Sequence, residues 1–103
     1  MNTFNQTPIH VIKARLWEWE GKGAWHFITI EKEQGQEIKN DWHWPRKGFG
    51  SMPVEVRIGS TKWRTSIFPE KGGSYLLPIK KSVREEKNIR AGDTLELEIC
   101  VLT

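Results

Sequence analysis

Apolar and polar residues alternate one by one along several short stretches of this chain, and this period of two restricts its fold more than any other feature. The C-terminal stretch is the clearest example, because Leu95, Leu97 and Ile99 are separated by Glu96 and Glu98. Successive side chains of a β-strand point to opposite faces, so the pattern predicts a strand with one buried face. We expect the leucine and isoleucine side chains to lie in the core.

Glycine-containing turns join other alternating stretches and predict β-hairpins. Residues 9–20 and 24–30 are expected to form the first hairpin, with two glycines in its loop. Residues 53–58 and 61–68 are expected to form the second hairpin around the turn that begins at Gly59. The apolar residues that share one face of the second hairpin's first strand, and that we expect in the core, are Val54, Val56 and Ile58.

Two helices are predicted between the strands. Residues 31–39 are polar and tolerate a helix, but Gly35 costs about 1 kcal/mol in a helix interior, so this helix should be short and weak. A second helix is predicted to begin near Ser82, because Ser82 and Glu85 have the spacing of a capping box. Pro78 cannot donate a backbone hydrogen bond, which indicates a strand end or a sheet edge before this helix.

Six short strands joined mostly by tight turns favour a mainly β fold over a helical one. With 103 residues, the chain has the size of one domain. The predicted architecture is a small six-stranded β-barrel or pseudo-barrel with one or two short helices, covering residues 1–103. Residues 1–8 are expected to form a flexible N-terminal tail.

The hydropathy pattern also bears on where the protein resides. Lys, Arg or Glu interrupts every hydrophobic stretch, so no membrane helix is predicted and no membrane partner is expected. The N-terminal residues lack the basic start and apolar middle of a secretory signal, which favours the cytoplasm. Cys100 is the single cysteine and lies in a predicted strand, so no internal disulfide is expected.

Four separated motifs spread over most of the chain are similar to those of a known protein family. In chain order they are GKGAWHFITI, RKGFGSMPVEVRIGSTKWRTSIFP, GGSYLLPIKKSVR and AGDTLELEI. With these motifs the chain resembles a bacterial family, the domain of unknown function numbered nineteen-oh-five. The resemblance implies a double-split β-barrel, similar to the swapped-hairpin barrels of transition-state regulators and antitoxins. It implies no activity, because none is established for the family.

The C-terminal part of the chain is similar to those regulators in a second way. LPIKKSVREEKNIRAGDTLELEI resembles their succession of strand, proline, helix, Gly-Asp turn and strand. HFITIEKEQGQEI is interpreted as a degenerate copy of the same unit, without the proline that the family pattern favours near Glu31. One chain would then imitate a dimer of regulators. Those regulators bind DNA, but this is an analogy of fold, and a fold does not determine function.

Positive charge is concentrated in the middle of the sequence. Residues 46–90 contain 11 Lys and Arg but only 4 Asp and Glu, whereas the whole chain has a net charge of +3. If these cations share a face, they favour an anionic partner such as nucleic acid; ordinary solvated surface is the alternative. The candidate anion-binding residues are Arg46, Lys47, Lys62, Arg64, Lys71, Lys80, Lys81 and Arg84.

Aromatic residues are the second candidate for a binding function. The chain has six tryptophans, and those in predicted strands are most simply explained as core residues or plugs at the barrel ends. Trp42, Trp44 and Phe49 differ because they lie in residues 41–52, a long segment without predicted structure. Aromatic side chains next to cations are typical of surfaces that bind single-stranded nucleic acid or planar ligands, although packing is the simpler explanation.

Residues suited to catalysis or metal binding are few. His10, His26 and His43 are far apart in the sequence, and none forms a pair with the spacing of metal ligands. Asp41 and His43 could form a base with its orienting partner, but no nucleophile motif accompanies them. We therefore predict no metal, no cofactor and no enzymatic activity.

Two functions remain open from the sequence. The first is a non-enzymatic binding domain whose basic face contacts an anionic partner such as nucleic acid. The alternative is a ligand-binding or protein-interaction module that uses the aromatic segment 41–52. The oligomeric state stays open, and a monomer is compatible with the sequence.

Overall fold

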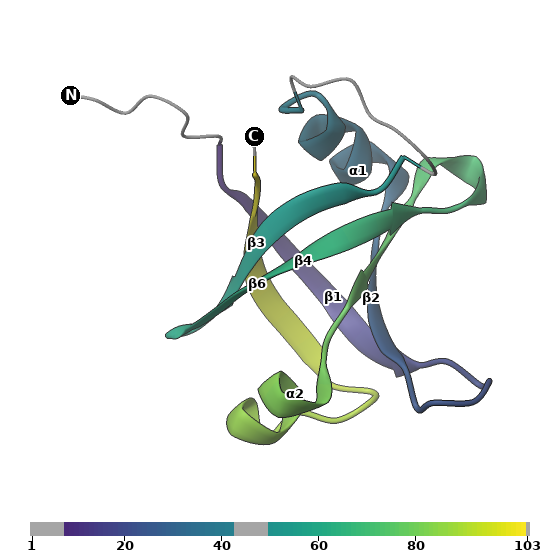
Figure 1. The fold of residues 1–103 in the computed structure, drawn as a ribbon, viewed down its shortest axis with the longest axis vertical. Coiled ribbons are helices and arrows are strands. Elements are labelled where there is room, and N and C mark those ends of the chain that lie inside the picture. The colour runs from purple at the N-terminus through teal and green to yellow at the C-terminus, as the bar shows by residue number, and fades with distance from the viewer. Residues whose placement is uncertain (1–7, 43–49, 103) are drawn as a thin grey trace.

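The protein folds as a closed antiparallel β-barrel, seen here in a computed structural model that describes residues 8–42 and 50–102 (Figure 1). The described residues form six strands, two α-helices and one short 3-10 helix. The strands are β1 His10–Glu18, β2 His26–Ile30, β3 Met52–Ile58, β4 Thr61–Pro69, β5 Tyr75–Pro78 and β6 Thr94–Val101. The helices are α1 Lys32–Lys39, η1 Lys71–Gly73 and α2 Lys81–Lys87. The predicted six-stranded barrel with two short helices is confirmed.

The strand order around the barrel is β1-β2-β5-β4-β3-β6, and pairing of β6 with β1 closes it. In chain order the elements form two successive sets, first β1, β2, α1 and β3, and then β4, β5, α2 and β6. If β1 is exchanged with β4, β2 with β5 and β3 with β6, the strand order around the barrel stays the same. The strand order therefore has the twofold symmetry expected of two copies of one unit, in which β2 pairs with β5 and β3 pairs with β6.

Alternating residues of the strands fill the barrel interior. Leu95, Leu97 and Ile99 are at most 5% exposed, and Val54 and Val56 are fully buried, as their alternation predicts. Ile58 is half-buried and packs against the same cluster. One contiguous core results, and each fully buried aliphatic side chain contributes about 1.5–3 kcal/mol to folding.

The two α-helices cover opposite ends of the barrel, with α1 at the top and α2 at the bottom of Figure 1. Each helix inserts one apolar side chain into the core, Ile38 from α1 and Val83 from α2. In the part of the chain that the structure describes, no helix is long and apolar enough to cross a membrane.

The predicted capping box of α2 is wrong. Lys80 is the N-cap residue and its side chain makes no capping hydrogen bond, while Ser82 already lies inside the helix. The Lys80 carbonyl accepts from the amides of Val83 and Arg84, so the first turn forms without a side-chain cap. β5 ends at Pro78, and this proline lies next to β2 at a strand end rather than at a sheet edge, because the barrel is closed.

Part of the expected N-terminal tail, residues 1–7, lies outside the described residues. Pro8 is described and exposed, and β1 begins at His10.

Candidate functional site

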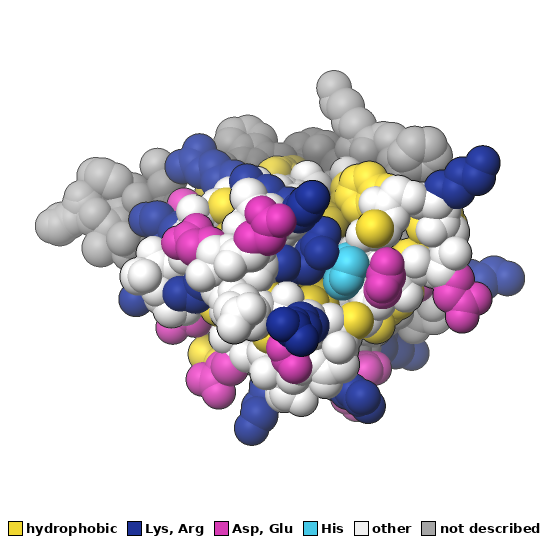
Figure 2. Space-filling model, turned by 90° about the horizontal axis from the view of Figure 1, so that it is seen from below, with side chains coloured by type: hydrophobic (Ala, Val, Ile, Leu, Met, Phe, Trp, Pro, Cys, Tyr) yellow, Lys and Arg dark blue, Asp and Glu magenta, His cyan; other side chains and the backbone are white. Residues whose placement is uncertain are grey.

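Four predicted anion-binding residues lie around one pocket at the α2 end of the barrel. This pocket, called the basic pocket below, has a volume of about 310 Å³ and lies between the β1–β2 loop, β4 and the start of α2. Its cationic residues are Arg64, Lys80, Lys81 and Arg84, and the described residues that line it include no Asp or Glu. Figure 2, which views this end, shows Lys and Arg side chains beside a histidine, with acidic side chains among them.

Each cation comes from a defined backbone position. Arg64 points outward from β4 and is 73% exposed, because Trp63 next to it points inward, as strand alternation predicts. Lys80 and Lys81 are the N-cap and first residues of α2. Arg84 is one turn further on, and its Nε donates to the Ile79 carbonyl at 3.0 Å. This hydrogen bond holds the Arg84 side chain against the chain segment that enters the helix.

Two ring side chains form the inner surface of the basic pocket. Trp63 is 8% exposed, and His26, at the start of β2, is the one polar residue among the described buried ones, at 9%. The His26 Nδ1 lies 2.8 Å from the Ala24 carbonyl, which fixes the ring plane. Gly23 and Ala24 both have positive φ angles, so the β1–β2 loop turns sharply and brings this carbonyl within hydrogen-bond distance of the histidine.

Carboxylates lie near the rim and pair only weakly with the pocket cations. Arg64 Nε is 3.7 Å from Glu55, and Lys81 Nζ is 3.9 Å from Glu85, with both cationic side chains more than 70% exposed. Exposed ion pairs contribute about 0–1 kcal/mol and are screened by salt. A phosphate group can therefore compete with these carboxylates for Arg64 and Lys81.

Two other predicted cations, Lys62 and Lys71, do not line this pocket. Lys62 points outward two residues before Arg64, but it lines a different hollow together with Glu55 and Glu98. Lys71 lies in η1, which packs against α1 at the opposite end. Arg46 and Lys47 lie outside the described residues.

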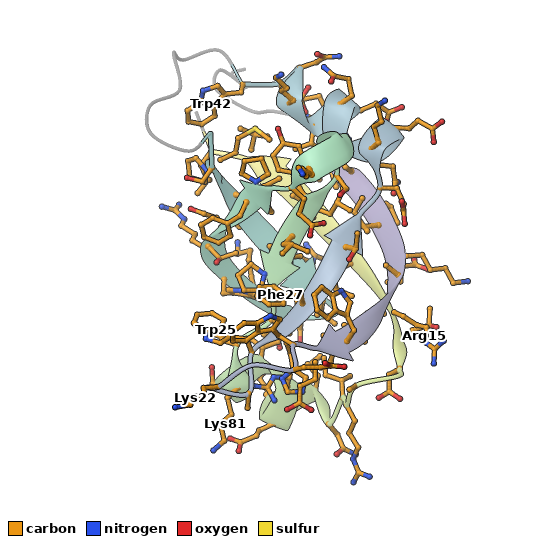
Figure 3. The ribbon with its side chains drawn as sticks, turned by 90° about the vertical axis from the view of Figure 1, so that its right-hand side faces the viewer. Arg15, Lys22, Trp25, Phe27, Trp42 and Lys81 are labelled. Carbon is orange, nitrogen blue, oxygen red and sulfur yellow. The ribbon has the colours of Figure 1, made fainter. Side chains whose placement is uncertain are left out.

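Of the three candidate aromatic residues of segment 41–52, the structure describes only Trp42. Trp42 is half-buried and packs against the core, and Figure 3 shows it at the end of the barrel away from Trp25. Trp44 and Phe49 lie outside the described residues.

An aromatic groove on the outside of the barrel was not anticipated. It has a volume of about 470 Å³ and is lined by Trp17, Trp19, Trp25, Phe27, Phe68, Glu70 and Leu76. Of the tryptophans assigned to strands, only Trp63 is a core residue; Trp17 is half-buried, and Trp19 and Trp25 are 47% and 54% exposed. β1 ends at Glu18 and β2 begins at His26, so Trp19 and Trp25 belong to the loop. Alternation already places Trp17 and Trp19 opposite the buried Leu16, and this signal could have revealed the groove.

Of the histidine and aspartate considered for catalysis, only Asp41 lies within the described residues. Asp41 is paired with His10, whose Nε2 lies 2.5 Å from the Asp41 Oδ2, and both side chains are about 15% exposed. His43 lies outside the described residues. The His10–Asp41 pair ties the start of β1 to the turn after α1 and lies outside both the pocket and the groove. No cluster of three or more His, Cys, Asp or Glu suited to a metal occurs within residues 8–42 and 50–102.

These features define a small closed barrel with a cationic pocket at one end and an aromatic groove on its side. A comparison with family models identifies the chain as a member of one family, described as "Domain of unknown function (DUF1905)", whose model matches residues 13–99. No curated protein matches the chain. The family membership confirms the resemblance found from the sequence motifs.

Proposed function

We propose that this protein is a non-enzymatic domain that binds the phosphate backbone of nucleic acid at the basic pocket. The observation that supports the proposal is that Arg64, Lys80, Lys81 and Arg84 line one concavity without a carboxylate among its described lining residues. Guanidinium and ammonium groups are the side chains that most often contact phosphate oxygens.

Nucleic acid fits the basic pocket better than a buried small anion does. Arg64 and Lys81 are largely exposed, so their charges remain accessible to an extended polyanion on the surface. Arg84 is held in place, which reduces the side-chain entropy lost when it binds a phosphate. Several successive phosphates could contact both Arg64 on β4 and the three cations at the start of α2. A single phosphate could be bound by one of these two groups alone.

The test is a fluorescence-anisotropy titration of a mixed-sequence duplex oligonucleotide at several salt concentrations. Reversing Arg64 and Lys81 to Glu removes two phosphate contacts, so the log-affinity against log-salt slope should flatten by about 1.8 units. The matched control reverses Lys62 and Lys71 to Glu. This control changes the net charge by the same amount, but both residues lie outside the basic pocket.

Circular dichroism would show that all variants remain folded. A wild-type protein that binds neither the duplex nor a single-stranded oligonucleotide at low salt contradicts the proposal. Equal losses in the pocket variant and the control also contradict it, because binding would then depend on net charge alone.

A further inference from the structure

We propose that the aromatic groove binds the bases of single-stranded nucleic acid while the basic pocket holds the phosphates beside it. This inference rests on the proposed function and adds the class of nucleic acid. It follows from Trp25, which lines both the basic pocket and the groove. Figure 3 shows Trp25 next to Phe27 and at the same end of the barrel as Lys22 and Lys81.

The rings of the groove are arranged as a stacking surface. Trp25 and Phe27 are nearly parallel, with an angle of 9° between the ring planes and 6.1 Å between the ring centroids. The ring centroids of Trp17 and Phe27 are 5.2 Å apart, and their planes are tilted by 40°. The indole nitrogen of Trp17 donates to the Thr29 hydroxyl at 2.9 Å, which fixes this ring against the barrel. Trp25 is 54% exposed, so its ring can stack with a base, and such stacking tolerates any sequence.

The loop between β1 and β2 is built to keep its two tryptophans on the surface. A Cβ at Gly21 would lie 2.0 Å from the Trp19 ring, so this ring lies directly over the glycine backbone. A Cβ at Gly23 would lie 3.1 Å from the Trp25 ring. Glycine at both positions lets the two rings pack close against the loop backbone, and Trp19 and Trp25 remain about half exposed.

Acidic and basic side chains lie at different parts of the groove. Glu70 lies within the groove and accepts a hydrogen bond from Ser74 at 3.0 Å, so phosphates are disfavoured around this carboxylate. The four pocket cations lie at the Trp25 side. Bases over the groove and phosphates at the basic pocket therefore match the distribution of charge, whereas an entirely apolar partner would leave these cations without a role.

The experiment compares a labelled single-stranded oligothymidylate with an abasic oligomer of the same length and charge. Wild-type protein should bind the thymidylate more tightly, because only this probe has bases to stack. Trp25→Ala should weaken thymidylate binding about 5- to 150-fold, the range measured for loss of one base–aromatic stack. It should leave abasic binding and the salt dependence unchanged, since no phosphate contact is lost.

Further variants separate stacking from folding defects. Trp25→Phe keeps a ring and should retain most of the affinity. Gly21→Ala displaces the Trp19 ring without deleting it and should weaken thymidylate binding while leaving the free energy of unfolding nearly unchanged. Val11→Ala is the control, because Val11 is an exposed apolar residue of β1 outside the groove.

The ways in which the inference can fail are distinguishable. If wild type binds both probes equally, or Trp25→Ala weakens both equally, the stacking inference is overturned while phosphate binding at the basic pocket stands. If neither probe nor the duplex binds at low salt, the proposed function fails as well. Concentration-dependent dimerisation of wild type that Trp25→Ala abolishes, measured by sedimentation, would assign the groove to a protein contact and overturn the inference.

Discussion

At the α1 end of the barrel, α1 and η1 pack against each other, whereas at the α2 end the equivalent helix and loop leave the basic pocket between them. The two ends are related by the twofold symmetry of the strand order. Matching the N-cap residues of the two helices, Glu31 and Lys80, equates residues of the first half with residues of the second. The difference between the ends can then be traced to individual side chains.

Two pairs of equivalent residues account for the difference. The match equates Gly35 of α1 with Arg84 of α2, and Tyr75 of β5 with His26 of β2. At the α1 end the Tyr75 ring covers Gly35 so closely that a Cβ there would lie 2.8 Å from the ring. At the α2 end a smaller ring and a long cationic side chain occupy these positions and both line the basic pocket. One copy of the unit thus closes the barrel, and the other provides a charged cavity.

The largest expected difference between the ends concerns their ring residues. Tyr75→Ala removes an aromatic side chain that is 5% exposed and should lower the free energy of unfolding by about 3–5 kcal/mol. His26→Ala should lower it by only about 1–2 kcal/mol, because it mainly loses one hydrogen bond beside a pocket that water can enter. Urea denaturation of both variants measures the difference. Equal losses would show that the α2 end is packed as tightly as the α1 end.

The helix positions should differ less. Gly35→Ala forces a Cβ against the Tyr75 ring and the Gly73 carbonyl, which costs about 1–3 kcal/mol, partly offset by the roughly 1 kcal/mol better helix propensity of alanine. The net effect is expected to be a loss of up to about 2 kcal/mol in the free energy of unfolding. Arg84→Ala, at the equivalent position, should change it by less than about 1 kcal/mol. A stabilised Gly35→Ala variant in thermal or urea denaturation would contradict this account of the α1 end.

The sequence predicts the barrel well because its evidence is local. Alternation places Leu97 and Val56 in the core, and both are buried as predicted. The helix predicted near Ser82 begins one residue earlier, at Lys81, but its capping box is wrong because the N-cap residue is Lys80, which has an extended backbone conformation and makes no side-chain cap. A side-chain spacing alone does not report that conformation.

The candidate site was less predictable because barrel closure determines which surface residues meet. Lys62 and Arg64 point outward from one strand two residues apart, yet they line different hollows, since their neighbours across the sheet differ. Arg64 meets the α2 residues only because β5 lies next to β4 and delivers the helix to that end. Trp25 could not be placed either, because the positive φ angles of Gly23 and Ala24 turn it out of the strand.

The smallest expected effect is also the sharpest test of the symmetry. His26→Tyr with Arg84→Gly transplants the ring and the glycine of the α1 end into the α2 end. Each single change should destabilise the protein, the first by crowding the introduced tyrosine ring against Arg84 and the second by the roughly 1 kcal/mol cost of glycine in a helix. In the double variant the tyrosine ring can pack over the glycine. Its loss of unfolding free energy should therefore be smaller than the sum of the two single losses by about 1 kcal/mol.

A double-mutant cycle of urea denaturation measures this coupling. The packed ring would also occupy the basic pocket, so oligonucleotide affinity should fall further in the double variant than in Arg84→Gly alone. Lys62→Glu is a useful reference, because it changes surface charge without touching either ring position. Strictly additive free energies would mean that the equivalence of the two ends does not extend to side-chain packing. The basic pocket would then have to be explained by the β1–β2 loop, which is longer than the equivalent β4–β5 connection, rather than by His26 and Arg84.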